Sequence, residues 1–453
     1  MLKEKLKIFL ILIGLNFFFN KSSYANPSLI RDREIEKFLY QLATPIFLQA
    51  NLNPSEIEIF IINDNSINAF VSNGQKIFIN TGLIRKFNTP DALIGVIAHE
   101  TGHIASGHLV RSNEGMSDAQ NAMILSYLLG IGAIVSGSAD AGSAIIVGGM
   151  QSAQRLMIKY TRNQEESADS QALKYLENLA YPADGLLAIL SFFDSQMLGY
   201  KNQIDEYLLT HPISSKRIEL IKARTANQKF TNQKINRKLQ PEMDLVLAKL
   251  EGFLDEPDDL IKKYQDQHSF SARYVKAIAY FRKGQIDQSL QNIDSLIKEK
   301  PQSGFLYDLK GQILFESGKN QEAIIAYNQA LKNLLPKDSA LTKVSFALAL
   351  ISIKENDYDL INLAIQKLNE AQKFEKNNPI LFKTLASAYA KINDENSANI
   401  ALAEFNLLVD QKEKCLKIAD KVIKNLDKTI VNNQQLLLKA NDLKEFCKKD
   451  SDN

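Results

Sequence analysis

The stretch His99-Glu100-Thr101-Gly102-His103 decides the fold class and the chemistry of the first half of this chain. In an α-helix, positions i and i+4 lie on one face, so both imidazoles can reach a single metal ion. Glu100 then reaches a water on that metal rather than the metal itself. The pattern predicts a hydrolytic site with Glu100 as the general base and a metal that lowers the pKa of the water. Two surface histidines on a helix are the alternative interpretation.

A third metal ligand must come from elsewhere, because a catalytic zinc ion usually has three protein ligands and one open position. His108 lies five residues after His103 and would be turned about 140° from it on a continued helix, which makes it a poor candidate. Glu165 and Asp169 are spaced i and i+4 at the start of a second expected helix. One of these carboxylates can bind the metal while the other orients a ligand histidine. Two solvated helix carboxylates are the alternative.

Residues 1–25 have the features of a secretory signal peptide. Three lysines precede the twelve-residue apolar core Ile8–Phe19, which only Asn16 interrupts, and small residues permit cleavage after Ala25. The apolar core is too short for a membrane anchor. A buried N-terminal helix is the alternative, but the order of charged, apolar and small residues favours export.

The overall composition limits the functions that this chain can have. The 453 residues, 45% apolar and 23% charged, predict two to four folded domains. The 54 Lys and Arg balance 52 Asp and Glu, so we expect no nucleic acid partner. No apolar run reaches the roughly 18–20 residues needed to cross a bilayer. After export, Cys415 and Cys447 are expected to form a disulfide. Two cysteines exclude a Cys-based zinc ribbon.

The residue pattern changes along the chain. Before about residue 225 it predicts both helices and strands, namely a helix over 30–48, a strand over 57–62, a hairpin over 69–79 with an Asn73-Gly74 turn, and a helix over 91–110. Residues 226–240 are polar and resemble a linker. From about 240 onwards strand signals vanish, and helix-length segments alternate with short polar breaks.

A repeat of 34 residues marks the second half. The matching positions are Gly284 with Gly318, Ala277 with Gly311, Ile293 with Tyr327, and Leu296 with Ala330, and Pro301 and Pro336 close the two units. These are features of tetratricopeptide repeats, which stack into a concave surface for extended segments of other proteins. An inert helical cap is the alternative. His268, at the repeat boundary, is expected to be an ordinary surface histidine.

His99–His103 followed by Glu165-Glu166-Ser167-Ala168-Asp169 resembles the HExxH…ExxAD pattern of the HtpX and CAAX-prenyl-protease family of zinc metallopeptidases. The resemblance covers about residues 30–225 and includes Thr210-His211-Pro212 followed by Arg217. The export signal, the absence of membrane spans and the helical second half are similar to the soluble periplasmic branch of this family, which carries C-terminal tetratricopeptide repeats.

The resemblance implies a set of site residues. One Zn²⁺ per chain would be held by His99, His103 and Glu165, with Glu100 as the catalytic base. Asp169 and Arg217 would support these ligands from behind, and His211 would act near the metal. His211 has two available roles, because it can occupy the fourth coordination position and shut the enzyme off, or it can stabilise the oxyanion of the reaction.

We therefore expect an α+β zincin-like metalloprotease domain with a small β-sheet, followed by an all-α tetratricopeptide-repeat solenoid. The expected ranges are a signal peptide at 1–25, the protease at 26–225, a linker and bridging helix at 226–268, and the repeats at 269–453. The glycine-rich segment 115–150 is either a tightly packed helical hairpin or a lid that covers the cleft or touches the membrane.

Two functions compete at this point. The first is an exported zinc endopeptidase. For this function the resemblance implies a role in periplasmic protein quality control, in which the enzyme degrades outer-membrane β-barrel proteins or assists their assembly. Its partners would be unfolded or stalled outer-membrane proteins and the β-barrel assembly machinery, with at most peripheral membrane contact. The second is a chaperone or scaffold with a structural or silenced zinc site. The intact Glu100 favours the peptidase, because a structural zinc site has no use for a base.

Overall fold

The computed structural model describes residues 29–72, 75–108, 162–198, 211–226, 236–353, 357–426 and 431–448. The described residues form two compact units, the first up to Leu254 and the second from Asp255 onwards. The expected signal peptide, the Asn73-Gly74 turn and the segment 115–150 lie outside the described residues. Within the described ranges, no helix is long and apolar enough to cross a membrane.

The first unit contains a four-stranded sheet with the order β1-β2-β4-β3. The strands are β1 (Leu29–Ile30), β2 (Glu58–Ile62), β3 (Ala69–Ser72) and β4 (Lys76–Asn80). β3 and β4 pair antiparallel, which confirms the hairpin. β2 runs parallel to β4, a pairing that the sequence did not predict. Because the hairpin turns its second strand towards β2, β3 becomes the edge strand of the sheet.

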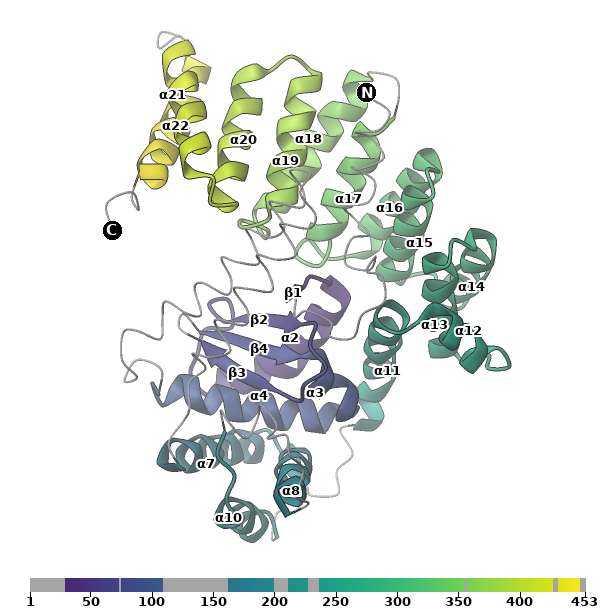
Figure 1. Cartoon of the computed structure of the whole chain (residues 1–453), viewed down its shortest axis with the longest axis vertical. Helices are drawn as coiled ribbons and strands as arrows, with labels where there is room; N and C mark the ends of the chain where they lie inside the picture. The colour runs from purple at the N-terminus through teal and green to yellow at the C-terminus, as the bar shows by residue number, and fades with distance from the viewer. Residues whose placement is uncertain are drawn as a thin grey trace. The chain divides into compact units, whose positions relative to one another are not determined.

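Helix α4 forms the central layer of this unit (Figure 1). It lies between the sheet with α2 on one side and α7 with α8 on the other. The helices of the unit are α2 (Arg33–Gln49), α3 (Thr81–Lys86), α4 (Pro90–Ala105), α7 (Arg162–Asn178), α8 (Asp184–Leu198), α10 (Ser215–Thr225) and α11 (Asn236–Leu254). Since α4 has neighbours on all sides, every residue from Ala92 to His103 is buried.

Two glycines let α4 approach its neighbours closely. A Cβ atom at Gly95 would lie 2.6 Å from the backbone nitrogen of Leu186 in α8, and one at Gly102 would lie 2.6 Å from the carbonyl oxygen of Ala168 in α7. Real Cβ atoms essentially never come so close to backbone. Gly102 therefore sets the distance between the two helices that carry the HExxH and ExxAD patterns.

Helix boundaries differ from the sequence-based ranges for local reasons. The first helix begins at Arg33, because the Asp32 side chain accepts hydrogen bonds from the backbone N–H groups of Glu34 and Ile35. Ile30 belongs to strand β1 instead. The central helix ends at Ala105, five residues before its expected end at 110, because Gly107 adopts a φ of 63°.

Helix α11, which falls in the expected bridging segment, packs onto the first unit. Its buried residues Leu239, Met243, Val246 and Leu250 belong to the same apolar core as α2 and α4. The buried Lys249 ammonium lies 2.7 Å from an Asp32 carboxylate oxygen and 3.0 Å from one of Glu34. These contacts join α11 to the N-terminal end of α2.

Over its described residues, the second unit consists of helix α12 followed by antiparallel helix pairs (Figure 1). The helices are α12 (Pro257–Tyr264), α13 (Phe270–Arg282), α14 (Ile286–Glu299), α15 (Gly304–Glu316), α16 (Asn320–Asn333), α17 (Ala340–Ile351), α18 (Tyr358–Gln372), α19 (Pro379–Lys391), α20 (Glu395–Leu408), α21 (Lys412–Asn425) and α22 (Val431–Lys448). The solenoid predicted from the 34-residue spacing is confirmed.

The repeat positions have clear physical reasons. Gly284 and Gly318 have φ values of 76° and 79° and end helices α13 and α15, a conformation that glycine adopts without strain. A Cβ at Gly311 would lie 2.5 Å from the ring of Tyr327. The matched small and aromatic positions therefore pack against each other within one helix pair.

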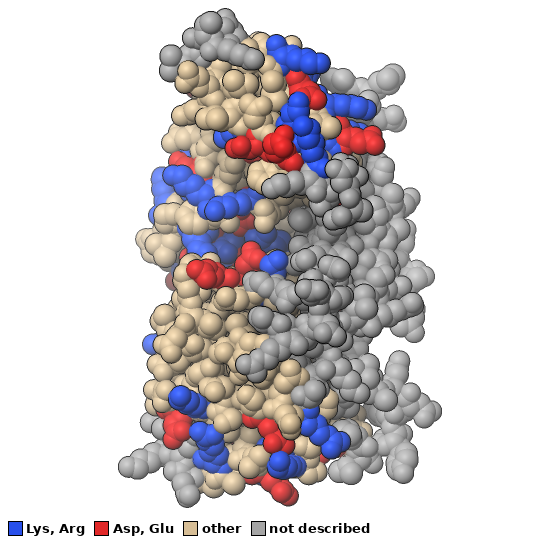
Figure 2. Space-filling model, turned by 90° about the vertical axis from the view of Figure 1, so that its left-hand side faces the viewer, with Lys and Arg blue, Asp and Glu red and all other residues tan. Residues whose placement is uncertain are grey.

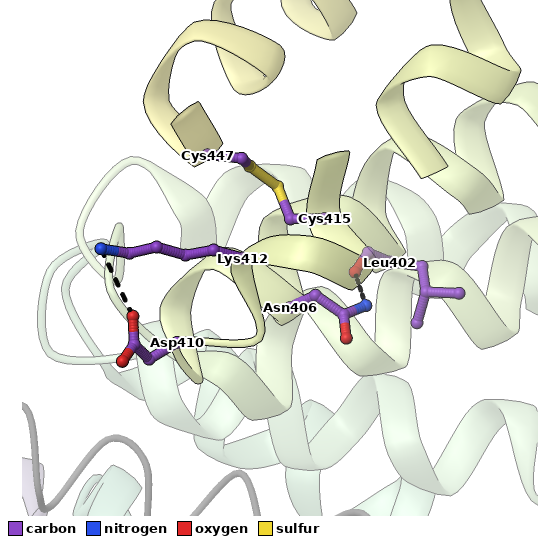
Figure 3. Close-up of a disulfide and its surroundings, with 6 residues drawn as sticks. All are labelled: Leu402, Asn406, Asp410, Lys412, Cys415 and Cys447. Carbon is purple, nitrogen blue, oxygen red and sulfur yellow. Dashed lines mark hydrogen bonds and ion pairs between the residues drawn. A yellow bond between two sulfur atoms is a disulfide. The ribbon is translucent and has the colours of Figure 1, made fainter. Parts of the chain in front are cut away.

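The terminal helices are joined covalently. Figure 3 shows the disulfide between Cys415 in α21 and Cys447 in α22, the pairing that the sequence predicts. The two Cα atoms are 6.2 Å apart, within the ordinary range for a disulfide. Both cysteines belong to a small apolar core shared by α20, α21 and α22.

The charged side chains show no strong segregation on the face in Figure 2. Lys and Arg side chains lie interspersed with Asp and Glu side chains there, as expected for a chain with a net charge of only +2. The described residues on this face therefore form no extended surface of a single sign.

Candidate active site

Four buried side chains of the first unit converge on one point. His99 and His103 come from α4, Glu165 from the first turn of α7, and His211 from the turn before α10. One donor atom from each of these residues lies within 4.8 Å of the others. All four side chains are at most 1% exposed, so the point of convergence is screened from solvent.

The spacing of these donor atoms resembles the edges of a tetrahedron. His99 Nε2 lies 3.1 Å from His103 Nε2 and 3.4 Å from His211 Nδ1. Glu165 Oε1 lies 3.2 Å from His103 Nε2 and 3.0 Å from His211 Nδ1. Zinc–nitrogen bonds of about 2.0–2.1 Å in a tetrahedral site place the ligand atoms about 3.3–3.4 Å apart. The donor set therefore fits a metal ion.

Arg217 and Asp169 brace the ligands from behind. Asp169 Oδ1 lies 2.9 Å from His99 Nδ1, so the Nδ1–H can donate to it and leave Nε2 free for a metal. Arg217, 1% exposed, donates from Nε and Nη2 to the two Asp169 oxygens and lies 2.6 Å from Glu165 Oε2 through Nη1. The same Nη1 donates to the Pro212 carbonyl. One guanidinium thus links both carboxylates to the turn that carries His211.

Local sequence explains this arrangement. The spacing i, i+4 puts Glu165 and Asp169 on the face of α7 that meets α4 at Gly102. Ser214 accepts a hydrogen bond from the backbone N–H of Arg217 and caps α10, which places Arg217 in the first turn of that helix. The sequence-predicted residues Glu100, Asp169, His211 and Arg217 thus lie together with the three predicted ligands.

Glu100 points its carboxylate into the same centre. Neither of its oxygens has a hydrogen-bond partner in the described part of the chain, and Oε1 lies 3.6 Å from His211 Nε2. Burial raises the pKa of Glu100, an effect that His211 and His99 partly offset. A carboxylate with a raised pKa and unused acceptor atoms is suited to take a proton from water.

The buried charges point to a cation. Glu100, Glu165 and Asp169 bring three buried carboxyl groups together, and the buried Arg217 guanidinium contacts two of them, Glu165 and Asp169. Burial raises the pKa of Glu165, but contacts with His211, His103 and His99 outweigh it and hold that pKa well below its usual value. A divalent cation would bring the cluster to neutrality.

The two ligand histidines have different surroundings. Burial lowers the pKa of His99, but hydrogen bonds to Asp169 and Glu165 outweigh it and raise the pKa to about 10. Burial lowers the pKa of His103 to about 3. The negative charge of Asp169 and Glu165 can be balanced either by a proton on His99 or by a metal ion.

His211 is tied to the edge of the sheet. Its Nε2–H can donate to the Ala69 carbonyl oxygen at 3.2 Å, which leaves Nδ1 facing His99 and Glu165. Asn80 N–H donates to the Asn68 carbonyl, so the backbone groups of the next residue, Ala69, point away from β4. His211 therefore contacts the outer edge of β3, an arrangement that spacing along the chain could not predict.

His108 stands close to the site, contrary to the geometric argument from the sequence. A helix that continued beyond His103 would turn His108 away from the site, but α4 ends at Ala105. His108 is buried and its Nδ1 lies 3.0 Å from Nδ1 of His103. It remains outside the group of potential metal ligands. Gly107 was the signal that could have revealed this turn. His268 is exposed, as predicted.

Comparison with known proteins shows which proteins the two units resemble. The model of peptidase family M48 matches residues 30–225, and that of a tetratricopeptide repeat-like domain matches residues 272–357. The beta-barrel assembly-enhancing protease of Escherichia coli is 25% identical over 308 residues, 65% of this chain and 61% of that protein.

Two further relatives align with different shares of this chain. The beta-barrel assembly-enhancing protease of Yersinia pestis is 23% identical over 326 residues, 69% of this chain and 65% of that protein. The mitochondrial metalloendopeptidase OMA1 of Arabidopsis thaliana is 27% identical over 164 residues, 36% of this chain and 30% of that protein. The chain thus spans about three fifths of the curated beta-barrel assembly-enhancing protease of Escherichia coli. The match to OMA1 covers a much smaller share of each chain. The HExxH helix, the ExxAD helix and their buried donor atoms all lie in residues 30–225, which form a peptidase family M48 domain.

Proposed function

We propose that this chain is a zinc-dependent endopeptidase. The observation that carries the proposal is the buried cluster of His99, His103, Glu165 and His211, whose donor atoms lie within 4.8 Å of one another, beside a Glu100 carboxylate with no hydrogen-bond partner in the described ranges. Two imidazoles and a carboxylate form a ligand set typical of catalytic zinc. Zn²⁺, when bound, would act as a Lewis acid towards water and the peptide carbonyl.

The residues of the site would have separate roles in the reaction. His99, His103 and Glu165 hold the ion, while Asp169 and Arg217 fix the orientation of His99 and Glu165. Glu100 accepts the proton of the attacking water and passes it to the leaving amine nitrogen. Its burial supports this role, since a raised pKa brings the carboxyl group closer to the proton affinity that the step needs.

His211 would regulate this site in its resting form. Nδ1 faces the ligand atoms, and the Nε2–H faces the Ala69 carbonyl, which is the tautomer required for Nδ1 to coordinate. An imidazole in the fourth position displaces the water that Glu100 would activate. The same arrangement favours the second candidate function, a chaperone or scaffold with a structural zinc site, because four protein ligands are typical of structural zinc.

The substrates would be exported polypeptides. The relatives in Escherichia coli and Yersinia pestis are named beta-barrel assembly-enhancing proteases, and the second unit carries the repeats that bind extended protein segments. We propose that residues 1–25 direct the chain to the periplasm. There it would degrade unfolded or stalled outer-membrane proteins or assist their assembly, and its repeats would contact the substrate or the β-barrel assembly machinery.

The test is the isosteric substitution Glu100→Gln. Glutamine keeps the shape of the side chain but cannot accept the proton of the water. We expect cleavage of an unfolded outer-membrane protein to be abolished, while zinc content and melting temperature stay close to wild type. Unchanged cleavage by this variant would refute the assignment of Glu100.

The same variant separates the two candidate functions. An inactive peptidase that still holds its substrate should retain that substrate in a pull-down from an envelope fraction. The other outcome is that neither the purified wild-type chain nor Glu100→Gln cleaves the outer-membrane protein, while both assist its refolding equally. That outcome would support the scaffold function and refute the peptidase function.

A further inference from the structure

The end of α4 folds back on itself through a specific turn. The His108 N–H donates to the carbonyl oxygen of His103 at 3.2 Å, and the Gly107 N–H donates to that of Ile104 at 3.1 Å. With a φ of 63° at Gly107, these two bonds define a Schellman motif. The motif reverses the chain direction and brings His108 beside the last histidine of the helix.

The imidazoles of His103 and His108 meet through equivalent nitrogen atoms. The two Nδ1 atoms are 3.0 Å apart, and both side chains are buried. A hydrogen bond at this distance needs one N–H and one lone pair. His103 directs its Nε2 towards Glu165 and His99, so its proton belongs on Nδ1. His108 therefore accepts through Nδ1 and carries its own proton on Nε2.

We propose that His108 is a positioning residue for the metal centre, because it accepts the Nδ1–H of His103 and so fixes the ring and the tautomer that present Nε2 to the ion. The inference rests on the proposed function, since it needs a metal that His103 holds. His108 does for His103 what Asp169 does for His99. The difference is that one ligand is backed by a carboxylate and the other by an uncharged imidazole.

This difference has a chemical consequence. A carboxylate partner makes a coordinating imidazole more electron-rich and adds negative charge to the site. A neutral imidazole holds the ring in place without adding charge. With three carboxyl groups already buried at the site, a further carboxylate behind His103 would leave the site with excess negative charge.

Two variants of His108 separate hydrogen bonding from packing. His108→Phe keeps a planar ring in the buried position but removes the acceptor. His108→Asn keeps an acceptor atom near the place of Nδ1 but removes the ring. His268→Phe, at the exposed histidine of the second unit, is the matched control. The dissociation constant for Zn²⁺ is measured on the full chain by competition with a chromophoric chelator.

We expect Zn²⁺ binding to weaken about 10–100-fold in His108→Phe, as for other substitutions behind a metal-binding histidine. His108→Asn and the control should stay close to wild type. Wild-type affinity in His108→Phe would overturn the inference, and so would an equal loss in both His108 variants, because the acceptor would then not matter. Failure of the wild-type chain to bind Zn²⁺ would instead refute the proposed function, and the inference with it.

A measurement on the unmodified protein keeps the inference testable if a variant does not fold. The chain has five histidines, so ¹⁵N spectra of the zinc-loaded protein with labelled histidine can distinguish their nitrogen atoms. We expect His108 Nδ1 to give the signal of an unprotonated nitrogen coupled through the hydrogen bond to a protonated His103 Nδ1. A protonated His108 Nδ1 would overturn the inference.

Discussion

At the scale of single residues, the site is a set of buried charges that hold one another in place. Arg217 is 1% exposed and contacts both Glu165 and Asp169. Burial raises the pKa of Asp169, but hydrogen bonds from His99 and Arg217 outweigh it and lower that pKa. The ionised form of Asp169 is therefore stabilised jointly by His99 and Arg217.

We expect Arg217→Met to destabilise the first unit by about 3–5 kcal/mol, because it leaves two buried carboxylates without their partner. Urea denaturation, followed by hydrogen exchange of peptides from α7 and α10, measures this loss. The neighbouring Lys216→Met is the control. The Lys216 side chain is 67% exposed in its ion pair with Glu166, and we expect a change of about 0–1 kcal/mol. Equal effects of the two substitutions would contradict this account.

We expect His211→Ala to raise the basal rate of cleavage, because it removes the imidazole that faces the metal ligands in the resting form. The rate is measured with the purified chain and an unfolded outer-membrane protein. His268→Ala, in the second unit, should leave the rate unchanged. A rate that falls about 10²–10³-fold would show that His211 stabilises the oxyanion instead. A wild-type rate would leave His211 with neither role.

At the scale of secondary-structure elements, the crossing of α4 and α7 sets the geometry of the site. The two helices carry His99, His103 and Glu165, and they touch where Gly102 faces the backbone of Ala168. Because a backbone carbonyl cannot rotate away as a side chain can, the two helices must move apart if Gly102 gains a side chain. The distance between His103 and Glu165 would then increase.

We expect Gly102→Ala to destabilise the first unit by about 1–3 kcal/mol and to weaken Zn²⁺ binding. At a solvent-exposed helix position, a Gly→Ala change would instead stabilise the fold by about 0.8–1 kcal/mol. A loss of stability would therefore show that Gly102 is in close contact with the backbone of α7. Chelator competition and urea denaturation provide the two measurements. Ala105→Ser, at an exposed position of the same helix, should change both by little. A more stable Gly102→Ala with wild-type metal affinity would show that the crossing tolerates a methyl group.

At the scale of the whole molecule, the metal site and the repeats lie in different units. His99, His103, Glu165 and His211 all belong to the first unit. The repeats of the second unit have a separate apolar core, built from α15 to α20. A bound ion therefore contributes directly to the stability of the first unit, whereas the disulfide between Cys415 and Cys447 acts on the last helices of the second.

We expect removal of Zn²⁺ with a chelator to accelerate hydrogen exchange in α4, α7 and the turn before α10, because a ligand stabilises the folded state that binds it. Peptides from α15 and α16 should exchange at unchanged rates and serve as the internal control. Reduction of the disulfide should instead accelerate hydrogen exchange in α22 of the second unit and leave the rates in the first unit unchanged. Equal acceleration in both units on chelation would contradict a metal site confined to the first.

The sequence by itself determined those features that depend on neighbours along the chain. The spacing of His99 and His103 sets two imidazoles on one helix face, and the spacing of Glu165 and Asp169 does the same for two carboxylates. Gly284 and Gly318, 34 residues apart, mark helix ends because they adopt positive φ values. The resemblance to a metallopeptidase family added Arg217 and His211, which no local periodicity could have joined to the site.

Only the tertiary structure decided the features that depend on distant residues. The parallel pairing of β2 with β4 places β3 at the edge, where the Ala69 carbonyl meets His211. The approach of α7 to Gly102 brings Glu165 to His103, and α11 joins the first unit through Lys249. His108 is a residue whose position could not be predicted from the sequence and was decided by the tertiary structure. Helical periodicity placed it away from the site, but one glycine with a positive φ ended the helix and turned His108 back towards His103, because the backbone conformation at a helix end outweighs the periodicity of the helix before it.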